Sequence, residues 1–252
     1  LQAIDAELKE CGLTNDDYVL ELLDEPDLNN SELVEKLLLA LQVAKEAVPE
    51  MKIQIVVENR SYPMSAFETL APYTDVWCLY DGRWNDAQLI AFMEEWQQGE
   101  GKELWFYACS TNLRENPYRY YRLHPWKAFA RNLDGMGLYE YMDSPDGKYG
   151  ARSWKIAPRG AVAYRNFDEP IPSVRFECFR EGIDDIKYLA KLSSLIQLAR
   201  EKGLNNGLIQ EAEIYLNTEP QKVVAQSYNP AYADEVREQV ANYIIQIQQL
   251  LK

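Results

Sequence analysis

The sequence predicts an α/β protein built on a parallel β-sheet, and three observations support this. Short apolar, β-prone runs alternate with amphipathic helical segments over about the first 140 residues, which gives five strand–helix units. The pattern then changes to a loop-like stretch over 142–172 and to helices from Val174 onward. Hydrophobic residues make up 47% of the 252 residues, which is enough for a large core.

Local signals place each element in order. Residues 1–11 are expected to form the last part of a helix that stops at Gly12. Ser31 is expected to be the N-cap of a long helix that ends before Pro49. Strands are expected at 17–23, 52–57, 74–80, 103–107 and 135–141. Helices are expected between them at 31–48, 63–70, 85–98 and 124–133, and after them at 174–202, 206–216 and 231–251.

This alternation is typical of the (β/α)8 TIM-type barrel. A complete barrel takes about 250 residues, but five units already use about 140 here, so three of the eight strands have no sequence to form them. We therefore expect residues 1–173 to form a partial β/α barrel, equivalent to the C-terminal five or so units. Residues 174–252 are expected to form a helical region that caps it.

The composition excludes several classes of protein. The chain carries 26 Lys and Arg against 40 Asp and Glu, a net charge of −14, which argues against nucleic-acid binding. No apolar run is long enough for insertion in a membrane. Four scattered cysteines and the single histidine, His124, form no metal-ligand spacing, and nothing suggests a metal or an organic cofactor.

Acidic and aromatic residues gather where the expected strands end, which is where parallel barrels place their active sites. These residues are Asp24, Glu25, Glu58, Tyr80, Tyr107, Glu140 and Tyr141, with Trp154 in the loop after the last strand. Carboxylates with aromatic residues and no histidine suit carbohydrate chemistry. There, a carboxylic acid protonates the leaving oxygen, and aromatic faces stack on sugar rings.

The adjacent carboxylates of Asp24 and Glu25 are the sharpest signal, although a loop in which Asp24 caps a turn before Pro26 is the alternative. A retaining glycosidase with two carboxylates needs a separate nucleophile about 5 Å from the acid, and chain neighbours do not readily face each other across a sugar ring. Adjacent acids fit substrate-assisted hydrolysis better. The 2-acetamido oxygen then attacks C1, Asp24 orients the acetamido N–H, and Glu25 protonates the leaving group and later activates water.

The other site residues have both a functional and a structural interpretation. Glu58 binds sugar hydroxyls or forms an ion pair with Arg60, and Glu140 binds sugar hydroxyls or pairs with Arg122. Tyr107 lines the pocket and bonds an acetamido group, or it belongs to the core. Sugar stacking is the interpretation for three further aromatic residues: Tyr80, Tyr141 and Trp154.

Five segments carry a more specific pattern: Asp24–Pro26, Leu104–Cys109, Tyr121–Trp126, Gly135–Tyr139 and Ile171–Leu189. The last contains Ser-x-Arg followed by Arg-Glu-Gly-x-x-Asp-x-x-Tyr-Leu. Within this stretch we interpret Arg180, Glu181 and Asp184 as structural pairing groups. Together the segments resemble glycoside hydrolase family 123 and the related domain-of-unknown-function 4091 proteins.

The resemblance implies a TIM-barrel β-N-acetylgalactosaminidase-like hydrolase that acts through an oxazolinium intermediate. It gives Asp24 the stabilising role and Glu25 the acid/base role, and it favours an extracellular or periplasmic location. The family places the Asp-Glu motif at barrel strand four. We therefore expect the chain to begin in the helix before that strand and to be completed by an N-terminal remainder of the same protein. Where many relatives have Trp, this chain has Glu140, which changes the pocket floor.

Two alternatives stay open. The first is a conventional two-carboxylate glycosidase that uses Glu25 with Glu58 or Glu140, which activity on glycosides lacking the 2-acetamido group would indicate. The second is a non-catalytic carbohydrate-binding or structural module, which would bind sugar without turnover.

Overall fold

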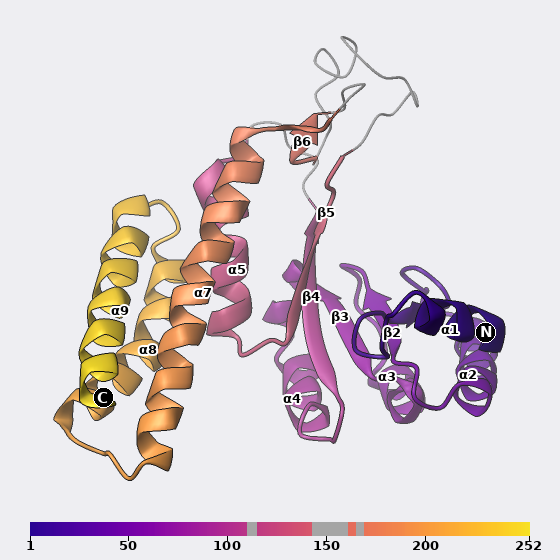
Figure 1. The fold of residues 1–252 in the computed structure, drawn as a ribbon. Helices are drawn as coiled ribbons and strands as arrows, with labels where there is room; N and C mark the ends of the chain where they lie inside the picture. The colour runs from indigo at the N-terminus through magenta and orange to yellow at the C-terminus, as the bar shows by residue number, and fades with distance from the viewer. Residues whose placement is uncertain (110–114, 143–160, 165–168) are drawn as a thin grey trace. The chain divides into compact units, whose positions relative to one another are not determined.

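The computed structural model describes residues 1–109, 115–142, 161–164 and 169–252 (Figure 1). Contacts divide the chain into two compact units. The sheet unit holds residues 1–108 and 133–137, and the helical unit holds residues 109–132 and 138–252. The predicted domains, 1–173 and 174–252, are a different division of the chain and stay a prediction.

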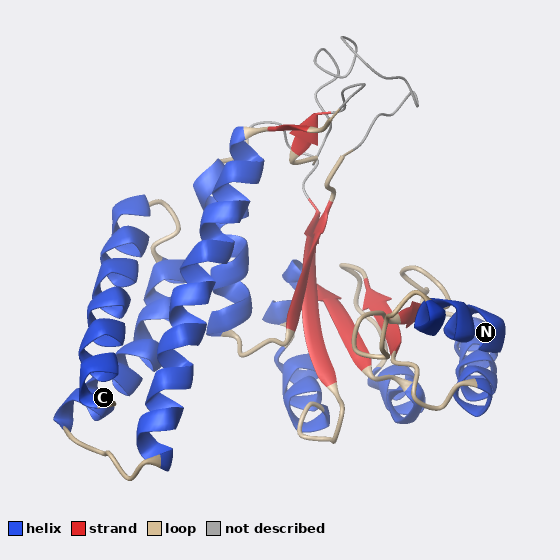
Figure 2. Cartoon of the chain, viewed as in Figure 1, coloured by secondary structure: helices blue, strands red, loops and turns tan. Residues whose placement is uncertain are grey.

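The sheet unit contains a five-stranded sheet with the order β1-β2-β3-β4-β5 (Figure 2). Its strands are β1 (Leu20–Glu21), β2 (Ile53–Val57), β3 (Val76–Tyr80), β4 (Glu103–Cys109) and β5 (Gly135–Tyr139). The first four strands pair in parallel in chain order. The prediction of an α/β fold with five strand–helix units is thereby confirmed, and the sheet is compatible with part of a TIM-type barrel.

The first strand, β1, is much shorter than the predicted run at 17–23. The carboxylate of Asp17 accepts hydrogen bonds from the backbone N–H and the hydroxyl of Thr14, at 2.7 and 2.8 Å, which holds residues 14–17 in a turn. At its other end the backbone bends directly after Glu21. The loop that carries Asp24 and Glu25 therefore begins inside the stretch predicted as strand.

The helices of the sheet unit are α1 (Gln2–Glu10), α2 (Ser31–Ala47), α3 (Met64–Leu70) and α4 (Ala87–Trp96), with 3-10 turns at Ala71–Tyr73 and Asp81–Asn85. The N-cap of α2 is Asn30, whose side chain accepts from the Leu33 N–H at 3.2 Å, so the prediction of Ser31 as the cap is wrong by one residue. The Asp86 side chain caps α4 by the same contact with Leu89, also at 3.2 Å. Each cap satisfies one of the N–H groups that a helix start leaves without an intrahelical partner.

Side chains alternate between the two faces of the sheet, as the pleat of a strand requires. One face joins the helices in a buried core that includes Leu41, Ile53, Ile55, Phe67, Trp77, Leu79, Leu89 and Leu104. On the opposite face, the register sets three pairs side by side: Glu21 with Gln54, Cys78 with Trp105, and Tyr80 with Tyr107. The polar and aromatic side chains near the strand ends therefore share the face turned away from the helices.

The helical unit contains a π-helical turn at Tyr118–Arg122, followed by α5 (Leu123–Ala130), α7 (Val174–Glu201), α8 (Gly207–Ala225) and α9 (Pro230–Leu250). A short antiparallel pair joins β6 (Ala163–Tyr164) to β7 (Ile171–Pro172), within the stretch predicted as loop. The core of the unit includes Trp126, Leu192, Ile209, Val240 and Ile247. Among the described helices, none combines the length and the apolar character needed to cross a membrane.

Helix α8 continues well past its predicted end at residue 216. It runs to Ala225 although Pro220 lies inside it. Proline removes one backbone hydrogen bond, but Leu216, Pro220 and Val223 are buried along the helix, and this packing favours a continuous helix.

A buried ion pair between Arg122 and Asp185 joins the elements of the helical unit. Arg122 Nε lies 2.8 Å from Asp185 Oδ2, and the Asp185 side chain is 0% exposed. Trp126 Nε1 and Arg237 Nη1 also donate to this carboxylate, at 2.8 and 2.9 Å. The predicted pairing of Asp184 is present too, but on the exposed side of α7, where Asp184 contacts Arg180 at 3.0 Å. The aspartate at the motif position, five residues after Arg180, is the buried Asp185, so the interpretation that chose Asp184 was one residue off.

Candidate active site

The loop after β1 brings Glu25 to the end of β4 within the sheet unit. The Tyr107 hydroxyl donates a hydrogen bond to Oε1 of Glu25. Glu25 has a φ of 42°, in the left-handed region that residues other than glycine rarely adopt. Such a conformation costs about 1–3 kcal/mol, so the surrounding structure must hold it. The buried side chains of Pro26 and Leu28, which follow directly, anchor the loop.

Tyr107 is a permanent hydrogen-bond donor at this position. Burial raises the pKa of Tyr107 far above its ordinary value, and the hydrogen bond to the Glu25 carboxylate raises it further. The phenol therefore keeps its proton at any pH near neutrality. The Tyr80 ring packs edge-on against it, with ring centroids 5.3 Å apart and an interplanar angle of 74°. The structure thus brings together three of the predicted site residues, Glu25, Tyr107 and Tyr80.

Asp24 lines a shallow hollow with Glu21, Leu22 and Leu23. Glu21 is the last residue of β1, and Gln54 Nε2 donates to its Oε2 at 3.2 Å. The pKa of Glu21 lies above its ordinary value, because partial desolvation and the negative charge of the neighbouring Asp24 both disfavour the charged form of its carboxyl. Glu21 was not among the residues predicted for the site, and its side chain is exposed.

Glu58, after β2, is held by its own loop. Its Oε1 accepts from the Tyr62 hydroxyl at 3.0 Å and lies 3.1 Å from Arg60 Nε. The ion pair between Glu58 and Arg60, one of the two interpretations of Glu58, is therefore present. The role of Glu58 in sugar binding stays a prediction.

Glu140 and Tyr141 follow β5 and belong to the helical unit. The Glu140 carbonyl accepts from the Val162 N–H at 3.1 Å, and the exposed Tyr141 ring lies edge-on to Phe176, with centroids 6.2 Å apart. Arg122, the predicted ion-pair partner of Glu140, contacts Asp185 and Asp234. Trp154 lies outside the described residues, so its predicted role, like those of Glu140 and Tyr141, stays a prediction.

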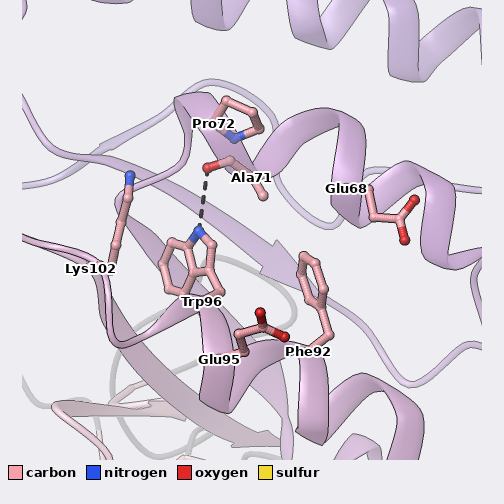
Figure 3. Close-up of a pocket in the computed structure, with 8 residues that line it drawn as sticks. Glu68, Ala71, Pro72, Phe92, Glu95, Trp96 and Lys102 are labelled. Atoms are coloured by element: carbon pink, nitrogen blue, oxygen red, sulfur yellow. Dashed lines mark hydrogen bonds between the residues drawn. The ribbon is translucent and has the colours of Figure 1, made fainter.

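A larger pocket of 540 Å³ lies elsewhere in the sheet unit, between the C-terminal ends of α3 and α4 (Figure 3). Phe92 and Trp96 form its aromatic wall, and Trp96 Nε1 donates to the Ala71 carbonyl at 3.3 Å. None of the predicted site residues lines this pocket. Its volume therefore says nothing about the chemistry at Asp24 and Glu25.

The chemistry available at the strand ends is proton transfer. Within the described ranges, no group of three or more His, Cys, Asp or Glu side chains is placed to hold a metal ion. The cysteines Cys11, Cys78, Cys109 and Cys178 are free thiols. The adjacent carboxyl groups of Asp24 and Glu25 can exchange protons with a substrate. Glu25 accepts a hydrogen bond from the Tyr107 phenol, and Asp24 lies beside Glu21.

Comparison with protein families identifies the class of this protein. A model of the glycoside hydrolase 123 catalytic domain matches residues 1–192. This is more than half of the chain, which therefore belongs to the glycoside hydrolase 123 family and is a glycoside hydrolase. The matched range includes the Asp24–Glu25 loop and the start of α7, so the family predicted from the motifs is confirmed. A comparison with curated proteins found no significant match.

Proposed function

We propose that the protein is a retaining β-N-acetylhexosaminidase, similar to an N-acetylgalactosaminidase, that uses substrate-assisted catalysis. One observation supports this most strongly. Glu25 accepts a hydrogen bond from Tyr107, whereas the next residue toward the N-terminus, Asp24, lines a shallow hollow. The two carboxylates therefore have different surroundings, which suits two different roles.

In the first step, the acetamido oxygen of the substrate attacks C1 while the bond from C1 to the leaving oxygen breaks. Glu25 gives its proton to that oxygen, and Asp24 accepts a hydrogen bond from the acetamido N–H, which stabilises the positive oxazolinium ring. In the second step, the Glu25 carboxylate takes a proton from water as the water oxygen attacks C1. The oxazolinium opens, and the configuration at C1 is retained.

The contacts of Glu58 engage one of its two carboxylate oxygens, and we take Asp24 rather than Glu58 as the second catalytic carboxylate. Its Oε1 already accepts from Tyr62 and pairs with Arg60. A nucleophile needs a free lone pair directed at C1, about 5 Å from the acid. Asp24, by contrast, needs only to accept one N–H from the substrate.

Two isosteric substitutions test the proposed roles. Asp24→Asn and Glu25→Gln are assayed with aryl 2-acetamido-β-glycosides as substrates. Each should lower kcat by about 100-fold or more. The matched control is Glu35→Gln, an exposed residue on the solvent side of α2. Wild-type rates for both variants would contradict the proposal.

A further inference from the structure

The pocket of 540 Å³ between α3 and α4 lies at the edge of the sheet where the strands begin (Figure 3). Helix α4 ends at Trp96 and β4 begins at Glu103, and Lys102, in the turn between them, lines the pocket. The contact between Glu25 and Tyr107 is made near the other end of β4. A ligand in this pocket is therefore separated from the catalytic carboxylates by the length of a strand.

The aromatic wall of the pocket is fixed by the core behind it. The Trp96 indole donates from Nε1 to the Ala71 carbonyl at 3.3 Å and lies edge-on to the buried Trp77, with ring centroids 6.4 Å apart. Phe92 lies one turn earlier on the same face of α4 and packs against the buried Phe67, also at 6.4 Å between centroids. Both wall residues stay partly exposed, so they offer a preformed apolar surface to a ligand.

The charges around this wall select the class of ligand. Glu68 and Glu95 line the pocket with exposed side chains, and both carboxylates would repel an anion. Lys102 Nζ lies 5.5 Å from the centroid of the Trp96 ring and donates to the Thr74 carbonyl at 2.6 Å, so a cation placed on this ring would meet a like charge. A wholly apolar ligand would remove water from the two carboxylates and give no hydrogen bond in return.

We propose that this pocket is a second, non-catalytic carbohydrate site that binds a neutral sugar ring. The C–H face of the sugar lies on Phe92 and Trp96, and its hydroxyl groups donate to the carboxylates of Glu68 and Glu95. The volume of the pocket falls within the range of about 300–1,000 Å³ that is usual for ligand sites. The inference goes beyond the proposed function, because it needs only a glycan ligand for a glycoside hydrolase and does not depend on the roles of Asp24 and Glu25.

The indole N–H resonance of Trp96 reports binding at this pocket directly. It is identified in 1H–15N spectra of the whole chain by its loss in Trp96→Phe, and the titrations use the Glu25→Gln background so that the probe is not cut. The probes are two neutral sugars, N,N′,N″-triacetylchitotriose and maltotriose, and two ions, tetramethylammonium and inorganic phosphate. We expect a saturable shift with at least one trisaccharide and none with either ion. A shift with an ion alone, or no shift with either trisaccharide, would overturn the inference.

A pair of neighbouring glutamates tests the role of the carboxylates. Glu95→Ala removes a charged acceptor from the pocket, and we expect the Kd of the bound trisaccharide to rise about fivefold or more. Glu94→Ala is the matched control, because Glu94 is exposed on the same helix and does not line the pocket. Thermal unfolding checks that both variants fold. Equal Kd values in the two variants would overturn the inference.

Turnover of aryl 2-acetamido-β-glycosides separates failure of this inference from failure of the proposed function. An active enzyme whose Trp96 resonance ignores both trisaccharides would overturn the second site alone. An enzyme without turnover of these glycosides, but with a saturable Trp96 response that Glu95→Ala weakens, would contradict the proposed function and support the second site.

Discussion

The Tyr107 hydroxyl, at the end of β4, donates a hydrogen bond to Oε1 of Glu25, which lies 82 residues earlier in the loop after β1. Strands β1 and β4 are separated by two others in the sheet, so the contact reaches across β2 and β3. It joins the glutamate proposed as acid/base to a phenol that keeps its proton. The first prediction concerns this contact.

Tyr107→Phe should lower kcat about tenfold while leaving the fold intact. The substitution keeps the ring that packs against Tyr80 and removes only the donor to Glu25. Steady-state kinetics on an aryl 2-acetamido glycoside measure the effect. Tyr73→Phe is the control, because its hydroxyl contacts Gln42 rather than a site residue. An unchanged kcat in Tyr107→Phe would show that the contact has no catalytic role.

Gly182→Ala should destabilise the helical unit by about 1–3 kcal/mol. A Cβ at this position would lie 2.3 Å from the Arg122 carbonyl oxygen and 3.1 Å from Pro125 Cδ, so backbone must move to admit it. Urea unfolding measures the change in the free energy of unfolding. Gly207→Ala, where a Cβ meets nothing within 4 Å, should be neutral or slightly stabilising. Equal effects of the two substitutions would contradict the packing described for α7.

Asp185→Asn should be strongly destabilising, by about 3–5 kcal/mol. The substitution leaves the guanidinium groups of Arg122 and Arg237 without the buried carboxylate that they share. Asp184→Asn, one residue away on the exposed side of α7, should change the free energy of unfolding by less than about 1 kcal/mol. Comparable losses for both variants would contradict the assignment of Asp185 as the buried partner.

The buried Cys78 thiol should make the folded protein less stable at alkaline pH. Burial raises the pKa of the Cys78 thiol to about 12 in the folded protein, whereas its ordinary value is 9.0. As pH rises from about 9 toward 12, the unfolded chain releases a proton that the folded chain keeps, so the folded state loses about 1.4 kcal/mol of stability per pH unit.

Comparison with Cys78→Ala isolates this contribution from the other titrating groups. Below about pH 9 the two proteins should differ by a constant packing term, and above it the advantage of the wild type should shrink. Urea unfolding across this range measures both. A stability difference that does not change with pH would show that the thiol ionises equally in both states.

The order of the strands and the grouping of Glu25, Tyr80 and Tyr107 could be predicted because parallel strands share one C-terminal edge. The contact between Tyr107 and Glu25 could not, since it depends on a left-handed backbone at a residue that is not glycine. The choice between Asp184 and Asp185 could have been made from the sequence, because the motif that begins at Arg180 places its aspartate at Asp185. Asn30 and Ser31 are both good helix caps, so only the backbone conformation decides between them.

The most direct test of substrate-assisted hydrolysis is a rate series on aryl 2-acetamido-β-glycosides in which the acetyl group carries none, one, two or three fluorine atoms. Fluorine withdraws electrons from the acetamido oxygen and weakens it as a nucleophile. We predict that kcat/KM of the full-length protein falls stepwise, by about tenfold or more across the series, because that oxygen attacks C1 in the rate-limiting transition state. A rate that is the same for all four substrates would contradict the account and show that the protein supplies the nucleophile itself.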